Sequence, residues 1–334
     1  MVRYAGSHAF CRDSPADEKG GEPQLGVVLD SAEGCVGPMR QLTPALAAAQ
    51  AGTGKVVLSP DGFTFTRVQG QGPPVVLVHG MTSPSLVWER FAPLLAGRGY
   101  RVVCYDLFGR GLSARPNVAM DPALFHRQLD AVIADSGGEP PVVVGYSWGA
   151  GVVASWAACV PRDVGAVVLV APGGVAESGG WGNAALRIPG VGEAIVAAGG
   201  RRGLLADVRR MFNSPHTAAE YLPRFVEQLE WEGYDRCFLA SLRDCPTSWS
   251  AAYRALGRSL ARVEVLWGDA DTKVPVALAP ALAALVPQSR LHVVAGGGHG
   301  MPWEAADAFA ASLFTALSTP GLQPGQSAGP GPSS

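Results

Sequence analysis

The stretch VVVGYSWGA, residues 142–150, places a serine at the centre of an uncharged run that extends from Pro140 to Pro161. The length of this run would allow a membrane-spanning helix. The run, however, opens with two prolines and three valines, and it contains three glycines. These residues favour a short buried strand, a sharp turn at Ser147 and a following helix over a membrane span.

The composition is that of a globular α/β protein. A chain of 334 residues fits one large domain with an insertion, or two smaller domains, and 48% hydrophobic residues allow a sizeable core. The formal net charge is -2 and no long basic run occurs, which disfavours a nucleic-acid partner. The cysteines form no CxxC pair, which disfavours a zinc site and a disulfide-rich protein, and no cofactor is expected. A Cys237–Cys245 disulfide would require an oxidising compartment.

The two ends differ in composition from the centre. Residues 1–53 are predicted to be a flexible extension, with a short helix at 42–50, and the Pro- and Gly-rich residues 319–334 a disordered tail. The first residues lack a basic segment followed by an apolar one, so no secretory signal is expected. The sequence favours an intracellular soluble protein without a transmembrane segment, and it leaves peripheral membrane contact open.

Between these ends, short apolar strands alternate with helical segments. Pro60-Asp61-Gly62 predicts a hairpin between the first two strands. The alternation predicts an α/β fold with a mostly parallel eight-stranded sheet and helices on both faces, built from 54–172 and 262–318. Strands are expected at 55–59, 63–68, 75–79, 101–106, 141–146, 166–171, 263–268 and 290–295, and helices at 86–97, 123–135, from 148, 276–286 and 302–317.

The block 173–261 interrupts this alternation. It has a helical pattern, no clear strand and many aromatic residues. We expect a helical lid over the carboxyl edge of the sheet, where open α/β sheets bind their ligands.

The serine turn matches a nucleophile elbow. Gly145-x-Ser147-x-Gly149 stands between a predicted strand and a predicted helix, and a turn this sharp leaves little room for Cβ atoms. The helix N-terminus would favour developing negative charge. The simpler alternative is a tight turn with an incidental serine.

A serine nucleophile needs a base, and the base needs an acid that orients it. His299 is the favoured base because it lies in the glycine-rich loop after the last strand. Asp269 and Asp271 both follow the strand at 263–268, and Asp271 is preferred for its distance from the strand end. Either aspartate could instead cap a helix. The other histidines stand at 8, 79, 126, 216 and 292.

An acyl-transfer site also needs donors for an oxyanion. The backbone N–H of Trp148 is one candidate, because it follows the nucleophile. The loop after the strand at 75–79 supplies the other, the N–H of Met81. His79 is predicted to stabilise this loop.

The chain resembles the α/β-hydrolase superfamily, in the lid-bearing group of esterases and lipases that includes monoacylglycerol lipase-like proteins. The resemblance covers about 55–317 and implies Ser147 as nucleophile, Asp271 as acid and His299 as base. It implies Met81 and Trp148 as oxyanion-hole residues. Relatives that open epoxides or dehalogenate carry aspartate at the nucleophile. The matching segments are HGMTSPSLVW (79–88), YDLFGRGLSARP (105–116), GYSWGA (145–150), LWGDADTKVP (266–275) and GGGHGMPWE (296–304).

The sequence thus predicts a serine hydrolase that cleaves carboxylic esters with an apolar acyl or alcohol part, through an acyl-enzyme. Two alternatives stay open. One is a lid-gated ligand receptor on a hydrolase scaffold. The other is a C–C or amide hydrolase, or a perhydrolase, with the same triad, because the fold does not choose among these reactions.

Overall fold

Eight strands form one sheet in the computed structural model, which describes residues 39–50, 54–159, 164–176 and 184–318. Their order is β1-β2-β4-β3-β5-β6-β7-β8. β2 is antiparallel to both of its neighbours and all other neighbours are parallel, so the predicted sheet is confirmed. The strands are β1 Gly54–Ser59, β2 Gly62–Gln69, β3 Pro74–Val78, β4 Arg101–Tyr105, β5 Val142–Tyr146, β6 Ala166–Val170, β7 Val263–Gly268 and β8 Arg290–Val294.

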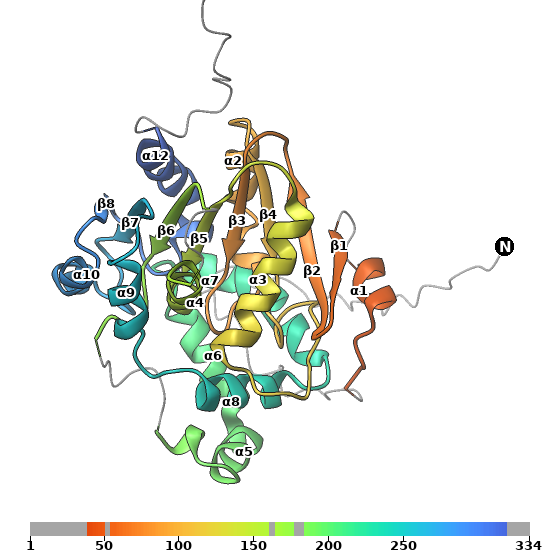
Figure 1. The fold of residues 1–334 in the computed structure, drawn as a ribbon. Helices are drawn as coiled ribbons and strands as arrows, with labels where there is room; N and C mark the ends of the chain where they lie inside the picture. Colours follow the sequence, from red (N-terminus) through yellow and green to blue (C-terminus); the bar gives the residue numbers. More distant parts are fainter. Residues whose placement is uncertain (1–38, 51–53, 160–163, 177–183, 319–334) are drawn as a thin grey trace, which may run out of the picture. The chain divides into compact units, whose positions relative to one another are not determined.

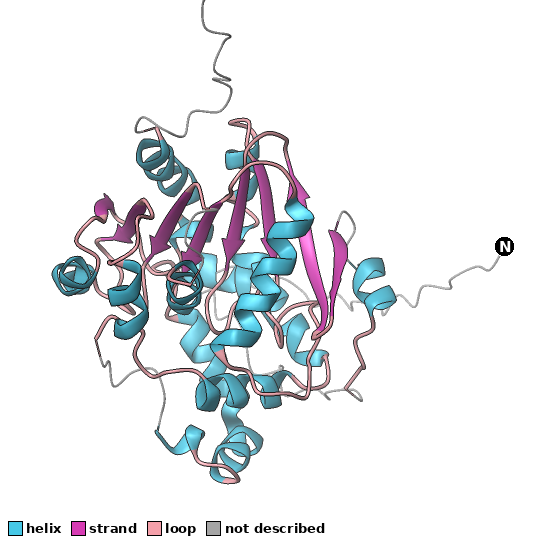
Figure 2. Ribbon diagram, in the orientation of Figure 1, coloured by secondary structure: helices cyan, strands magenta, loops and turns pink. Residues whose placement is uncertain are grey.

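Helices cover both faces of the sheet (Figures 1 and 2). α3 (Pro122–Ser136) and α4 (Trp148–Ala157) lie side by side on one face, and α2 (Ala92–Ala96) and α12 (Ala306–Leu317) contact each other on the other face. The central strands β3, β5 and β6 are therefore buried at every residue, which explains why their sequences are continuous apolar runs.

The uncharged run at 140–161 does not form one long helix. Its described residues divide into β5, the turn at Ser147 and α4, as the sequence predicts. Within the described part of the chain, no helix is long and apolar enough to cross a membrane.

Prolines and a kink divide three of the predicted helices. The helix expected at 86–97 is a 3-10 turn, η2 (Ser85–Trp88), followed by α2, because Pro93 lacks an N–H and fits only the first turn of a helix. The helix at 276–286 likewise begins as η6 (Val276–Leu278) before α10 (Ala279–Leu285). The last helix bends at Ala305, between α11 (Met301–Glu304) and α12.

Part of the predicted N-terminal extension is ordered. Residues 1–38 lie outside the described residues. α1 (Pro44–Gln50) contacts β1 and buries Ala47, and Arg40 forms a backbone bridge with Trp231. The short helix expected at 42–50 is therefore present as α1. The predicted tail at 319–334 also lies outside the described residues.

The residues described between β6 and β7 contain helices and no strand. Figure 1 shows α5, α6 and α8 beyond the carboxyl ends of the central strands. α9, in contrast, packs against α4 and α10, which lie outside the range predicted as lid, although α9 itself lies within that range. Cys237 and Cys245, both in this block, are free and buried. The segments are η3 Ala184–Arg187, α5 Val191–Ile195, η4 Val196–Gly200, α6 Arg201–Arg209, α7 Pro215–Val226, η5 Glu227–Glu230, α8 Tyr234–Asp244 and α9 Ser250–Leu256.

Candidate active site

Ser147 occupies a strained turn between β5 and α4. Its backbone has φ 56° and ψ -120°, a region that residues other than glycine rarely adopt. A Cβ on Gly145 would lie 2.7 Å from the Cα of Ala150, and one on Gly149 would lie 2.2 Å from the carbonyl oxygen of His79. The two glycines therefore allow the turn that presents the serine hydroxyl at the carboxyl edge of the sheet.

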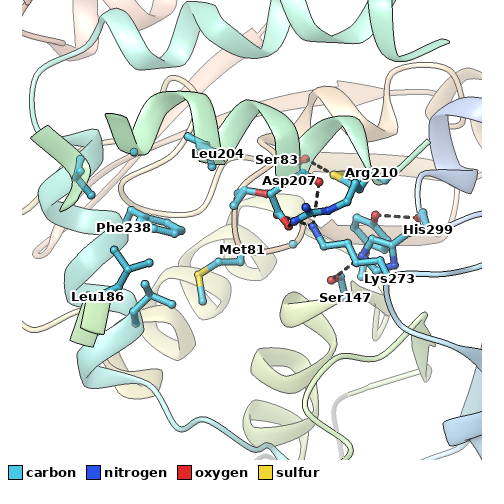
Figure 3. Close-up of a pocket in the computed structure, with 18 of the residues that line it drawn as sticks. Met81, Ser83, Ser147, Leu186, Leu204, Asp207, Arg210, Phe238, Lys273 and His299 are labelled. Atoms are coloured by element: carbon cyan, nitrogen blue, oxygen red, sulfur yellow. Dashed lines mark hydrogen bonds and ion pairs between the residues drawn. The ribbon is translucent and has the colours of Figure 1, made fainter. Parts of the chain in front are cut away.

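The three side chains predicted as a triad lie in one hydrogen-bonded chain. Nε2 of His299 is 3.0 Å from Oγ of Ser147, and Nδ1 of His299 is 2.8 Å from Oδ2 of Asp271. All three residues are buried. The loops after β5, β7 and β8 carry them, and these loops meet because the three strands run in parallel in one sheet. Figure 3 shows Ser147 and His299 together at one end of a pocket.

The structure separates the two candidate aspartates. Oδ1 of Asp271 accepts the backbone N–H groups of Lys273 and Val274 at 2.9 and 2.8 Å, so its other oxygen is held toward His299. Asp269 instead accepts the N–H of Gly296 at 2.7 Å. Asp269 thus fixes the glycine-rich loop that precedes His299.

Tyr146, which sequence analysis did not single out, anchors the histidine loop. Its hydroxyl donates to the carbonyl oxygen of His299 at 2.8 Å, and the two ring centroids are 5.1 Å apart. Burial, followed by the negative charge of Asp271, raises the pKa of Tyr146 well above its usual value, so the hydroxyl remains a donor. Its position beside the serine in the elbow was the available signal.

The sequence predicts the N–H groups of Met81 and Trp148 as oxyanion donors, and both residues lie beside the serine turn. The main chain of Gly80 passes Ser147 so closely that an added Cβ would be 3.3 Å from the serine Cβ. Among the residues that the structure describes, neither the N–H of Met81 nor that of Trp148 has a protein acceptor. Buried N–H groups rarely lack a partner, so both are available to a ligand.

A buried arginine holds the Met81 loop. Nε of Arg110 donates to the carbonyl oxygen of Met81 at 2.9 Å, and Nη1 donates to Oγ of Ser241 on α8 at 2.9 Å. Within the described chain, none of its hydrogen-bond acceptors is a carboxylate. Burial lowers the pKa of Arg110, yet an arginine stays charged in proteins. The only sequence signal for Arg110 was its position between two glycines in the loop at 106–113.

His79 has the supporting role that the sequence predicts. Its Nε2 accepts the N–H of Leu107 and its Nδ1 donates to the carbonyl of Gly80, each at 2.8 Å. The ring is therefore neutral, and burial lowers its pKa to about 4. Of the remaining histidines, His126 contacts Ser155, His292 contacts Glu264, and His216 is exposed.

A pocket of about 570 Å³ opens above Ser147 and His299. Figure 3 shows Leu186, Leu204 and Phe238 at one side, and Asp207, Arg210 and Lys273 at the side nearer the serine. The apolar residues come from the helices between β6 and β7. In the described ranges, no group of His, Cys, Asp and Glu side chains is placed to hold a metal ion.

Comparisons with known proteins agree with this fold. A hydrolase of 2-hydroxy-6-oxononadienedioate and 2-hydroxy-6-oxononatrienedioate from Cupriavidus pinatubonensis is 30% identical over 281 residues, covering 79% of this chain and 94% of the relative. An esterase structure from Rhodococcus sp. matches with a TM-score of 0.64 and 25% identity, covering 80% of this chain and 99% of that chain.

The haloalkane dehalogenase DatA from Agrobacterium tumefaciens has a similar fold, with a TM-score of 0.68 and 22% identity over 79% of this chain and 96% of that chain. A model of the α/β hydrolase fold family matches residues 73–306, which is more than half of the chain. Together with the sheet order and the position of the serine turn, this match shows that the chain belongs to the α/β-hydrolase fold family.

Proposed function

We propose that the protein is a serine hydrolase that cleaves carboxylic esters. The observation that carries this proposal is the hydrogen-bonded chain from Ser147 through His299 to Asp271, at the floor of a pocket. A hydroxyl is a weak nucleophile until a positioned base takes its proton, and this chain supplies both the base and the acid that orients it.

The proposed reaction has two halves. Oγ of Ser147 attacks the ester carbonyl while Nε2 of His299 takes the hydroxyl proton, and the Met81 and Trp148 N–H groups stabilise the oxyanion. The tetrahedral intermediate collapses, the C–O bond to the alcohol breaks, and His299 gives its proton to the leaving alkoxide. Water then attacks the acyl-enzyme with His299 as base, and the acid and free Ser147 are released. Asp271 holds the imidazole tautomer throughout.

The substrate is proposed to have an apolar acyl or alcohol part. The supporting observation is the apolar lining that the helices between β6 and β7 give the pocket. We propose that these helices act as a lid, as in the lid-bearing esterases and monoacylglycerol lipase-like proteins that the sequence resembles. The esterase from Rhodococcus sp. supports the reaction class.

Hydrolysis of a C–C bond is a second candidate. The relative from Cupriavidus pinatubonensis is named for hydrolysis of 2-hydroxy-6-oxo dicarboxylates, and its identity of 30% favours this alternative. The same serine, histidine and aspartate would serve. Turnover of a 2-hydroxy-6-oxo dicarboxylate at a higher kcat/KM than any p-nitrophenyl ester would select this reaction.

The test compares Ser147→Ala with Ser155→Ala. Ser155 is a matched control because its Oγ likewise lies within hydrogen-bond distance of a histidine nitrogen, 2.6 Å from Nε2 of His126, but Ser155 does not line the pocket above Ser147. We expect Ser147→Ala to abolish p-nitrophenyl butyrate hydrolysis and fluorophosphonate labelling, and Ser155→Ala to keep both. Labelling that persists in Ser147→Ala would refute the assignment. Negligible turnover across an ester panel, with tight ligand binding, would favour the receptor alternative.

A further inference from the structure

A charged cluster forms one wall of the catalytic pocket. Nζ of Lys273 is 2.6 Å from Oδ2 of Asp207, and Nη2 of Arg210 is 3.1 Å from Oδ1 of the same carboxylate. Lys273 lies in the loop after β7, two residues beyond Asp271. Asp207 lies on α6 and Arg210 directly follows that helix. The cluster therefore joins the loop of the proposed catalytic acid to the helices above the pocket.

The cluster carries one positive charge in excess. Burial raises the pKa of Asp207, but attraction to Lys273 and Arg210 outweighs burial and leaves the pKa below its usual value, so the carboxylate is ionised. Two cations then face one anion. The side chains of Lys273 and Asp207 are 20% and 34% exposed, so water screens them only in part.

The other wall of the pocket has no such charge. Leu186, Ile195 and Val196 come from the segment before α6, and Phe238 and Leu242 come from α8. Figure 3 shows Leu186 and Phe238 on the side away from Lys273. The pocket is thus apolar at one end and cationic at the end that holds the serine.

We propose that the cationic wall binds a carboxylate of the substrate, so that the preferred esters carry one acidic group beside an apolar part. This inference rests on the proposed ester hydrolysis and narrows its substrate class. One carboxylate matches the single excess charge, and it would take hydrogen bonds from Lys273 or Arg210, which are strong when both partners are ionised. Asp207 competes with the substrate for the same donors.

A purely structural role for the cluster predicts no change in selectivity between acidic and neutral esters. If the ion pairs only tie α6 to the loop after β7, their loss would affect neutral and acidic esters alike. Selectivity between the two esters separates these roles, and Asp207 gives the sharpest contrast because its removal frees both cations.

The experiment uses mono-p-nitrophenyl adipate and its methyl ester, which have the same backbone and differ by one negative charge. The ratio of kcat/KM for the acidic ester to that for the neutral ester is measured after subtraction of the enzyme-free rate. Both esters are assayed on one preparation, so the fraction of folded protein cancels from the ratio. Arg209→Met is the matched control, because Arg209 is exposed on α6 and does not line the pocket.

We expect the wild-type protein to prefer the acidic ester. Lys273→Met should lower the ratio about tenfold, as expected for a lost charge-assisted hydrogen bond, and Arg210→Met should lower it about threefold because that side chain is more exposed. Asp207→Asn should raise the ratio, and Arg209→Met should leave it unchanged.

Two results would overturn the inference. One is a kcat/KM ratio of acidic to neutral ester that stays the same in all the variants at Lys273, Arg210 and Asp207. The other is a lower ratio in Asp207→Asn. In either case hydrolysis of the neutral ester would leave the proposed function standing. If the wild-type protein cleaves neither ester and resists the fluorophosphonate probe, the proposed function fails and the inference fails with it.

Discussion

The molecule contains two comparable pairs of a carboxylate and an imidazole. One pair joins the strands β7 and β8, and the other joins the loops that follow these strands. Glu264 contacts His292 within the sheet, and Asp271 contacts His299 beyond its edge. Each pair is 28 residues apart in sequence, and each has an oxygen–nitrogen distance of 2.8 Å. β7 and β8 are parallel neighbours, so both pairs lie between adjacent elements, but the register does not set the 28-residue spacing because it places Glu264 opposite Arg290 and ends at Gly268 and Val294.

The two pairs differ in their third partner. The second oxygen of Glu264 accepts from Nε of Arg262 at 2.8 Å, so a cation shares that carboxylate. The second nitrogen of His299 faces the hydroxyl of Ser147 at 3.0 Å, beside the pocket. A carboxylate–histidine pair therefore implies catalysis only where the free nitrogen reaches a nucleophile that a substrate can approach.

The largest expected effect separates the two histidines. His299→Gln should lower kcat for p-nitrophenyl butyrate on the order of 10⁴- to 10⁶-fold, because the serine loses its base. His292→Gln should change kcat less than about threefold, since its ring does not line the pocket. Steady-state kinetics on folded variants, checked by circular dichroism, test this contrast. Equal losses in both variants would contradict it.

Substitutions of the two carboxylates should show the same contrast in kcat as substitutions of the two histidines. Asp271→Asn should lower kcat on the order of 10⁴-fold, because an amide stabilises the wrong imidazole tautomer. Glu264→Gln should leave kcat nearly unchanged and lower the free energy of unfolding by about 1–3 kcal/mol, because a buried hydrogen-bonded carboxylate is lost. Urea unfolding and kinetics on both variants give the comparison. An Asp271→Asn variant with wild-type kcat would refute the role given to Asp271.

Arg110 is expected to act on catalysis through Met81. Arg110→Met should lower kcat about 10- to 100-fold with little change in KM, because the Met81 N–H loses the contact that fixes its loop. Arg110→Lys should recover part of the loss, since an ammonium can reach one of the same acceptors.

Ser241→Ala serves as the control for Arg110, because it removes the contact between Arg110 and α8 and the bond from Ser241 to the Cys237 carbonyl but leaves the bond from Arg110 to Met81 in place. A loss in Arg110→Met that appears only in KM would point to a general structural role instead.

His79 extends the contrast to a histidine that hydrogen-bonds to no carboxylate among the described residues. The expected effect of this histidine is on stability. Its folded pKa of about 4 lies below the ordinary value of 6.5, so the unfolded chain binds the proton more readily between these values. The free energy of unfolding should therefore fall with falling pH, by about 3 kcal/mol in total from this group.

His79→Gln should remove this contribution, because glutamine does not titrate. Urea unfolding of the wild type and the variant at pH 7, 5.5 and 4.5 measures the difference in slope. Parallel pH profiles for the two proteins would contradict the assignment of a neutral, buried ring.

Much of the fold could be predicted because its signals are local. The valine-rich strands and the Gly145-x-Ser147-x-Gly149 turn carry their geometry in consecutive residues. The break at 89–91 was missed although Pro93 was visible, because the apolar spacing on either side fits one helix. Asp269 and Asp271 could not be separated from the sequence with certainty, since both follow β7 and only the folded loop shows which one turns toward His299.

The supporting contacts were not predictable from one sequence. The bond from Tyr146 to the carbonyl of His299 joins residues 153 apart, and that from Arg110 to Ser241 joins residues 131 apart. The pairing of Lys273 with Asp207 likewise depends on where α6 lies over the pocket. Such contacts depend on tertiary packing, and no spacing along the chain encodes them.

The most direct test of the central claim, that His299 and Asp271 activate Ser147, is the rate and site of fluorophosphonate modification. The protein is treated with the probe, the adduct is located by peptide mass spectrometry, and the rate constant is compared between wild type, His299→Gln and His292→Gln. The structure predicts one adduct on Ser147, formed at the wild-type rate in His292→Gln and at least about 100-fold more slowly in His299→Gln. An adduct on another residue, or a wild-type rate in His299→Gln, would contradict the claim.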